Sequence, residues 1–150
     1  MHSISSKAEM CKHTDPQIYN KAVQNGQLDI LKYLHQEGCS WDKETCRIAS
    51  KYGQLLCLDY LHKNGCEWDS RSCDAAAANG HLHILQYLHK RGCSWTKSTC
   101  YFAAFNGHLK CLQYLHENGC LWDARTSIVA VANGHLDCHV YTLANGVRDL

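Results

Sequence analysis

The chain has 150 residues and a mass of 17.0 kDa, which is the size of a single domain. Its 15 Lys and Arg and 14 Asp and Glu give a net charge of +1, so the strongly basic surface of a nucleic-acid-binding domain is not expected. No apolar stretch has the length of a membrane span or a signal peptide. The composition predicts a cytoplasmic protein, without nucleic-acid or membrane partners, whose 11 cysteines are reduced.

A repeat of 27 residues runs through most of the chain. All four tryptophans keep this step, and all ten glycines fall into two series that also keep it. The tryptophans are Trp41, Trp68, Trp95 and Trp122, and the glycine series begin at Gly26 and Gly38. A fixed period indicates stacked structural units. We expect a single domain over residues 15–150, with units at about 15–38, 39–65, 66–92, 93–119 and 120–146, after an N-terminal extension of residues 1–14.

Each unit is predicted to form two short helices. The first unit opens with Asp15 and Pro16, an N-cap followed by a proline at the first helical position. Each later unit opens with a residue whose side-chain oxygen can accept a hydrogen bond from the first helical turn. These residues are Asp42, Asp69, Thr96 and Asp123. Glycine ends each helix, and helices of about 9–11 residues are too short to be stable alone, so the units must stack.

The last unit, residues 120–146, differs from the others. His139 and Thr142 replace leucines of the second helix, and Leu143 replaces a repeated histidine. A terminal unit has one side in water and is expected to be more polar. The sequence therefore predicts that this helix is a polar cap and that the array is complete.

The run A-A-x-N-G-H-L-x-x-L-x-Y-L-H-x-x-G, seen at Ala76–Gly92 and Ala103–Gly119, resembles the two-helix body of an ankyrin repeat. The unit is shorter than the usual repeat of about 33 residues, and a G-C-x-W loop replaces the projecting β-hairpin. The resemblance implies an all-α, ankyrin-like solenoid of about five helix-turn-helix repeats without projecting β-hairpins. Short repeats with this loop are similar to those of giant-virus and protist ankyrin proteins.

The same resemblance implies a non-catalytic protein–protein interaction module that binds an unidentified protein partner. For a viral protein, the place of action would be the host cytoplasm. No phosphate-binding loop or hydrolase motif is present, so we do not expect an enzyme. A monomer is expected, and a self-associating structural repeat protein is the alternative.

Positions that vary between units indicate where a partner would bind. In ankyrin-like stacks the first helices line the concave surface, and three variable columns of these helices share one face. An aromatic centre with a charged rim is typical of a binding hot spot. The predicted binding residues are Glu44, Arg47, Lys51, Arg71, Asp74, Tyr101 and Phe105. A uniformly apolar column is assigned to the core instead, and its members are Ile48, Ala75, Phe102 and Val129.

Ten cysteines fall into three repeat columns, and His-x3-Cys pairs recur in four units. A structural zinc site needs four converging ligands, often with C-x2–4-C spacing, and no C-x2-C pair occurs. Equivalent residues of stacked helices lie about 8–10 Å apart, whereas a disulfide needs Cα atoms within about 7 Å. We therefore predict neither a metal site nor a cofactor, while a metal-binding or thiol-redox protein remains the second alternative.

Overall fold

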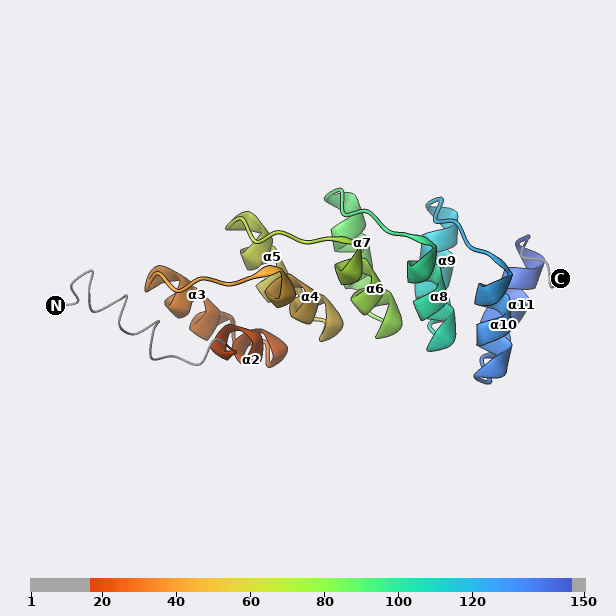
Figure 1. The fold of residues 1–150 in the computed structure, drawn as a ribbon, viewed down its shortest axis with the longest axis horizontal. Coiled ribbons are helices and arrows are strands. Elements are labelled where there is room, and N and C mark those ends of the chain that lie inside the picture. Colours follow the sequence, from red (N-terminus) through yellow and green to blue (C-terminus); the bar gives the residue numbers. More distant parts are fainter. Residues whose placement is uncertain (1–16, 147–150) are drawn as a thin grey trace.

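The computed structural model describes residues 17–146, and this part of the chain contains ten α-helices and no strand (Figure 1). The helices are α2 (Ile18–Gln24), α3 (Leu28–Gln36), α4 (Lys43–Lys51), α5 (Leu55–Lys63), α6 (Ser70–Ala78), α7 (Leu82–Lys90), α8 (Lys97–Phe105), α9 (Leu109–Glu117), α10 (Ala124–Ala132) and α11 (Leu136–Ala144). Each even-numbered helix and the one that follows it form one unit, so the described chain holds five units of two helices each. The prediction of an all-α solenoid without β-hairpins is confirmed for this part of the chain.

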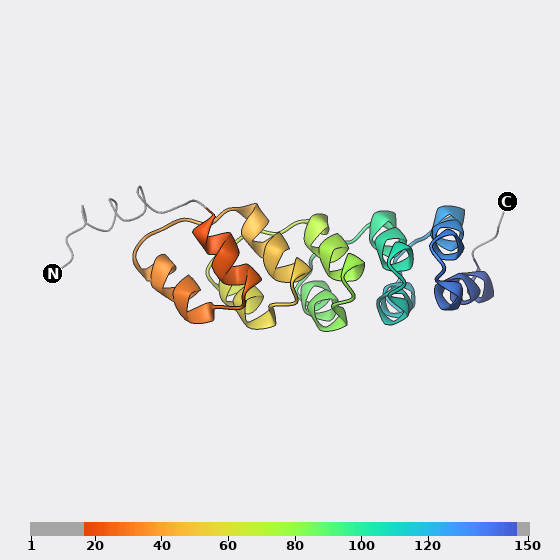
Figure 2. The same ribbon diagram turned by 90° about the horizontal axis from the view of Figure 1, so that it is seen from below.

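The units stack in two layers. The first helices, α2, α4, α6, α8 and α10, form one layer, and the second helices form the other (Figure 2). First helices of neighbouring units pack directly on each other, whereas second helices touch their neighbours far less. Small side chains allow this close approach, since Ala49, Ala76, Ala77 and Ala103 are all fully buried.

The predicted N-caps are confirmed in four units. The side chains of Asp42, Asp69 and Asp123 each accept a hydrogen bond of 3.0 Å from the backbone N–H two residues on, and Thr96 accepts one of 3.2 Å. The predicted start at Asp15 and Pro16 lies outside the described residues. Helix α2 follows Gln17, whose side chain does not cap it.

Loops of neighbouring units are joined through the glycine turns. Gly80 has a φ of +72°, a left-handed conformation that side chains rarely adopt, and an added Cβ there would lie 2.6 Å from the ring of His108 in the next unit. One unit earlier, Nε2 of His81 lies 2.9 Å from the carbonyl oxygen of Lys51. This contact confirms, for His81, the expectation that these histidines link adjacent loops.

An aromatic contact that the sequence did not predict crosses each boundary between units. The histidine near the end of each of the first four second helices stacks on the tryptophan of the following loop, with ring centroids 3.9 Å apart for His62 and Trp68. The tyrosine of the next unit meets that tryptophan edge-on, as Tyr87 meets Trp68 at 6.2 Å. The other three sets are His35, Trp41 and Tyr60; His89, Trp95 and Tyr114; and His116, Trp122 and Tyr141.

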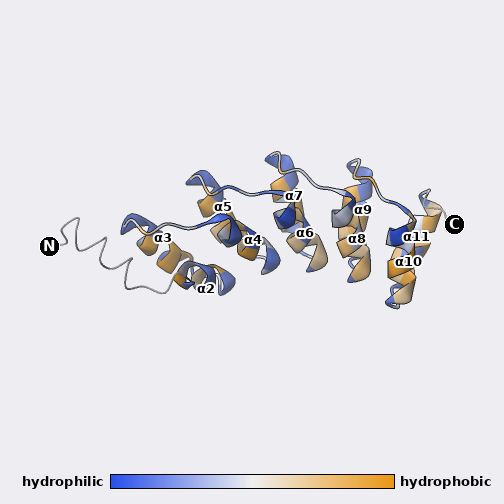
Figure 3. Cartoon of the chain, in the orientation of Figure 1, coloured by the Kyte–Doolittle hydropathy of each residue, from blue (hydrophilic) through white to orange (hydrophobic). Residues whose placement is uncertain are grey.

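The prediction of a polar C-terminal cap is wrong. Thr142 is fully buried, and the half-buried ring of His139 turns toward α10, where it lies 2.9 Å from the hydroxyl of Ser127. Apolar side chains are exposed on α10 and α11 instead, and the ribbon of both helices is largely in the hydrophobic colour (Figure 3). The exposed apolar residues are Ile128, Val131, Leu136, Val140 and Leu143, which are between 41% and 64% exposed. The polar residues thus form hydrogen bonds inside the last unit, and apolar side chains remain exposed on its two helices.

None of the helices in residues 17–146 has the length and apolar character needed to cross a bilayer.

Removing one N-cap should destabilise the stack measurably. We expect Asp69→Ala to lower the free energy of unfolding by about 1 kcal/mol, because the backbone N–H of Arg71 at the start of α6 loses its side-chain acceptor. Urea denaturation at neutral pH measures this change. Glu67→Ala is the matched control, since this exposed carboxylate lies in the same loop and caps no helix. Equal effects of the two substitutions would contradict the capping role.

Candidate functional site

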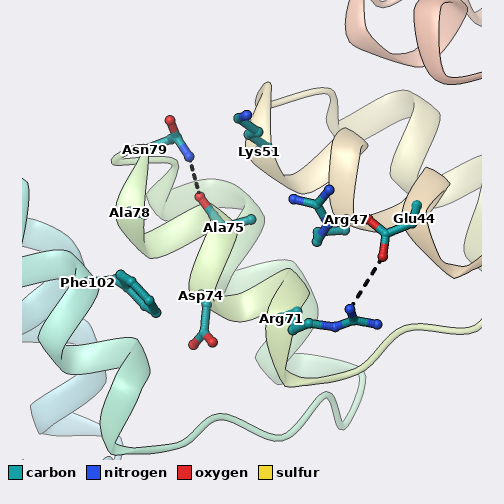
Figure 4. Close-up of a pocket in the computed structure, with 9 residues that line it drawn as sticks. All are labelled: Glu44, Arg47, Lys51, Arg71, Asp74, Ala75, Ala78, Asn79 and Phe102. Atoms are coloured by element: carbon teal, nitrogen blue, oxygen red, sulfur yellow. Dashed lines mark hydrogen bonds and ion pairs between the residues drawn. The ribbon is translucent and has the colours of Figure 1, made fainter.

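A groove of about 450 Å³ opens on the layer of first helices, between α4, α6 and α8 (Figure 4). We call it the first-helix groove. Its lining residues are Glu44, Arg47, Lys51, Arg71, Asp74, Ala75, Ala78, Asn79 and Phe102. Five of the seven binding residues predicted from the sequence therefore lie around one groove, because helical spacing places every third or fourth residue of stacked helices on the same face.

A charged network forms one wall of this groove. The carboxylate of Glu44 lies 2.6 Å from Nε of Arg47 on its own helix and 3.4 Å from Arg71 on the next helix. Arg71 also contacts Asp69 at 3.1 Å. These side chains are partly exposed, so the pairs add little to stability. Their effect is to hold two guanidinium groups side by side at the rim, where each retains N–H groups that can reach a ligand.

The carboxyl group of Asp74, at the base of the groove, has a shifted pKa. Burial raises the pKa of this half-buried carboxyl, and the hydrogen bond of 2.6 Å donated by the Thr99 hydroxyl opposes the change in part. The bond also joins α6 to α8. Asp74 thus carries a partly desolvated charge at the base of the groove, where a cationic or hydrogen-bond-donating group would meet it.

The floor of the groove is apolar. Ala75 and Ala78 leave space on α6, and the ring of Phe102 reaches into this space from α8 (Figure 4). The sequence assigned Phe102 to the core, and this was wrong, since its side chain is 37% exposed. Its column neighbours Ala75 and Val129 are buried as predicted, but the larger phenyl ring extends beyond the face of the stack.

The two predicted aromatic residues lie beside the groove rather than in it. Tyr101 lines a second hollow of about 230 Å³, which it shares with Phe102 and with residues of α10 and the loop before it. Phe105 lines neither hollow, although it is 41% exposed and its ring centroid lies 6.1 Å from that of Tyr101. Phe102 therefore separates two hollows on one face, and it is the residue that the sequence analysis missed.

In the part of the chain that the structure describes, the cysteines and histidines do not gather into a metal site. Within residues 17–146, no three His, Cys, Asp or Glu side chains lie close enough together to hold a metal ion. The repeated histidines are engaged by tryptophan rings instead. Nine of the ten cysteines in the repeat columns are free, buried thiols, and Cys39 is disulfide-bonded, which departs from the expectation that all are reduced.

Comparison with known protein families identifies ankyrin repeats in the middle of the chain. A family model described as "Ankyrin repeats (many copies)" matches residues 46–89 and again 73–116. These ranges contain α5, α6, α7 and α8 and most of α4 and α9, and thus the central part of the first-helix groove. A search of the curated proteins found no match to the chain.

Two carboxylates should affect the pH dependence of stability with opposite signs. The native pKa of Asp74 is raised, so its ionised form costs stability, and this cost appears as pH rises through the native pKa. Asp74→Asn, which keeps an oxygen for Thr99, should therefore raise the urea midpoint at about pH 7 and change little at about pH 3, where the carboxyl is protonated in both states.

Asp59 provides the opposite case. Hydrogen bonds from Lys63 and then Tyr87 lower its native pKa, so its stabilisation is present above the unfolded pKa and is lost as pH falls through the native pKa. Asp59→Asn should lower the urea midpoint at about pH 7, with the effect fading in acid. Shifts of the same sign for both variants at neutral pH would contradict these assignments.

Proposed function

The chain belongs to the ankyrin-repeat family, and from this premise we propose that it is a non-catalytic scaffold that binds a protein partner through the first-helix groove. The observation that carries the proposal is the composition of that groove. It combines an apolar floor around Phe102 with a rim of three cations and the carboxylate of Glu44, and the carboxylate of Asp74 lies at its base. An apolar centre surrounded by polar groups is the arrangement from which protein interfaces gain most of their binding energy.

The groove supports a partner of a particular chemistry. The space above Ala75 and Ala78 fits an apolar side chain that packs on the Phe102 ring. Arg47 and Arg71 can bind a carboxylate through paired N–H groups, and Asp74 can accept a hydrogen bond from a donor deeper in the groove. We therefore propose that the partner presents an apolar anchor flanked by an acidic residue.

Two further features of the groove support a scaffold rather than an enzyme. The charged groups of the groove pair largely with each other. No cysteine lines the groove, so it lacks a thiol nucleophile. The proposed place of action is the cytoplasm, or the host cytoplasm for a viral protein.

Variants of the groove test the proposal. Affinity capture from the source cell with the wild type should identify binding proteins, whose affinities are then measured with purified components. We expect Phe102→Ala to weaken the binding of a genuine partner by about thirtyfold, as truncation of a hot-spot aromatic residue costs about 2 kcal/mol. Arg71→Ala should weaken it further and reduce its salt dependence.

The matched control is Leu56→Ala, which truncates a 71% exposed apolar side chain on the layer of second helices. It should leave binding unchanged. Equal binding by the wild type and the Phe102→Ala and Arg71→Ala variants would show that the partner uses another surface. Circular dichroism and urea midpoints must match across the set, so that loss of binding is not loss of folding.

A second candidate function is favoured by the apolar end of the stack. Val131 is 47% exposed, whereas its equivalents Ala77 and Ala104 are covered by the next unit and fully buried. Two copies can cover this face by packing their last units against each other about a twofold axis. Self-association would then replace the expected monomer.

Sedimentation measurements over a range of protein concentrations test this second candidate. A dimer in the wild type should be converted to a monomer by Val140→Lys, because a cation would have to be buried in the interface. Gln113→Lys is the matched control, since Gln113 holds the equivalent position of α9 one unit earlier. A wild type that stays monomeric at high concentration would exclude the dimer.

A further inference from the structure

When the loop after each second helix is counted with the helix pair that precedes it, the cysteines of two different repeat columns meet inside each of three units. In the central unit, Cys73 lies in the first turn of α6 and Cys93 follows α7, and their sulfur atoms are 3.6 Å apart. The same pairing recurs between Cys46 and Cys66, and between Cys100 and Cys120, which share side-chain hydrogen bonds. The distance between stacked helices bears only on cysteines of the same column, so the repeat pattern did not predict this pairing between columns.

One thiol of each pair is close to the surface. Cys93 lines a hollow of about 380 Å³ together with His89, Trp95 and the loop between them. Cys66 lines a similar hollow of about 350 Å³ beside His62 and Trp68. Cys66, Cys93 and Cys120 are each 5% exposed, whereas their partners Cys46, Cys73 and Cys100 are completely buried. Each pair therefore has an outer and an inner thiol.

We propose that each of these pairs is a site of reversible thiol oxidation, which forms a disulfide within the unit by exchange with a small-molecule disulfide such as glutathione disulfide. A disulfide has an S–S distance of about 2.05 Å, so the sulfur atoms of Cys73 and Cys93 must approach by about 1.5 Å. This movement replaces the thiol–thiol contact and the bond of 3.3 Å from Cys93 to the carbonyl oxygen of Asp69.

The outer thiol reacts first. The thiol of Cys73 donates a hydrogen bond to the sulfur of Cys93, which lowers the pKa of Cys93 and raises that of Cys73. The Cys93 thiolate attacks one sulfur of glutathione disulfide, so that a mixed disulfide forms and one glutathione thiolate leaves. The proton lost by Cys93 balances the proton that this glutathione takes up.

The inner thiol completes the exchange. Cys73 loses its proton and attacks the Cys93 sulfur, which forms the bond between Cys73 and Cys93 and breaks the bond to glutathione. The second glutathione leaves as a thiolate and takes up the proton. Overall, two protein thiols are oxidised to one disulfide, and one glutathione disulfide is reduced to two molecules of glutathione.

Each of the three disulfides would cross-link two parts of one unit. Each bond ties a first helix to the loop that follows the second helix of the same unit, and so closes a short segment of chain. Such a cross-link stabilises the fold by restricting the unfolded chain. Because the bonds lie inside single units, oxidation strengthens each unit without closing the first-helix groove, which contains no cysteine.

To test the proposal, the full-length, reduced protein is incubated with glutathione disulfide under native conditions. Its disulfides are then mapped by proteolysis without reduction and by mass spectrometry. We expect links between Cys46 and Cys66, Cys73 and Cys93, and Cys100 and Cys120. Cys57 and Cys111, whose thiols are buried without such a pairing, should remain free. The midpoint of thermal unfolding should rise by about 5 °C or more.

Single substitutions separate the two steps. Cys73→Ser, which introduces the residue that Ser127 provides in the last unit, should leave glutathione attached to Cys93 while the other two pairs still link. Cys93→Ser should leave the buried Cys73 unmodified. Cys111→Ile is the control, because Ile84 occupies that column in the preceding unit, and it should keep all three links.

The proposal is overturned if the three pairs stay reduced while circular dichroism shows a folded protein. It is equally overturned if these links appear only at urea concentrations that unfold the chain, or if Cys73→Ser shows no glutathione on Cys93 while the other pairs link.

Discussion

The packing of one first helix on the next is the interaction on which the rest of this structure depends. A nine-residue helix such as α6 is too short to persist alone in water, and a single pair of helices cannot bury its own apolar face. Ala76 and Ala77 are fully buried because their small side chains let neighbouring helices approach closely. Polar bonds follow the same geometry, as when Thr99 of one unit donates to Asp74 of the previous one.

This stacking also explains the unusual composition. A residue that packs well at one boundary between units recurs at the following boundaries. One repeated packing arrangement therefore produces a high count of cysteine, histidine or tryptophan. The histidines, which invited a metal interpretation, lie flat on tryptophan rings, with His116 and Trp122 centroids 4.3 Å apart. The cysteines divide into buried, unpaired thiols such as Cys111 and thiol pairs such as Cys73 and Cys93. The high counts of cysteine and histidine therefore have different structural causes, and the cysteines themselves are of two kinds.

The candidate binding face was largely predictable because helical spacing alone places Glu44, Arg47 and Lys51 on one side of α4. The error at Phe102 has a physical cause. Its column neighbours are Ala75 and Val129, whose small side chains remain within the stack, and the column pattern does not reveal that a larger ring projects beyond it. The polar cap was mistaken for a related reason, since the substitution of leucine by His139 and Thr142 does not show toward which side those residues point.

The sequence by itself determined the period, the helices, their caps and their glycine ends, and hence the stacked all-α fold, because these depend on contacts between residues close in the chain or repeated at a fixed step. Only the tertiary structure decided which side chains from different columns meet. The pairing of Cys73 with Cys93, the hydrogen bond of Tyr87 to Asp59 and the groove around Phe102 depend on distances of a few ångströms between separate elements. Such distances follow from how the helices are placed against one another, and a one-dimensional period does not contain them.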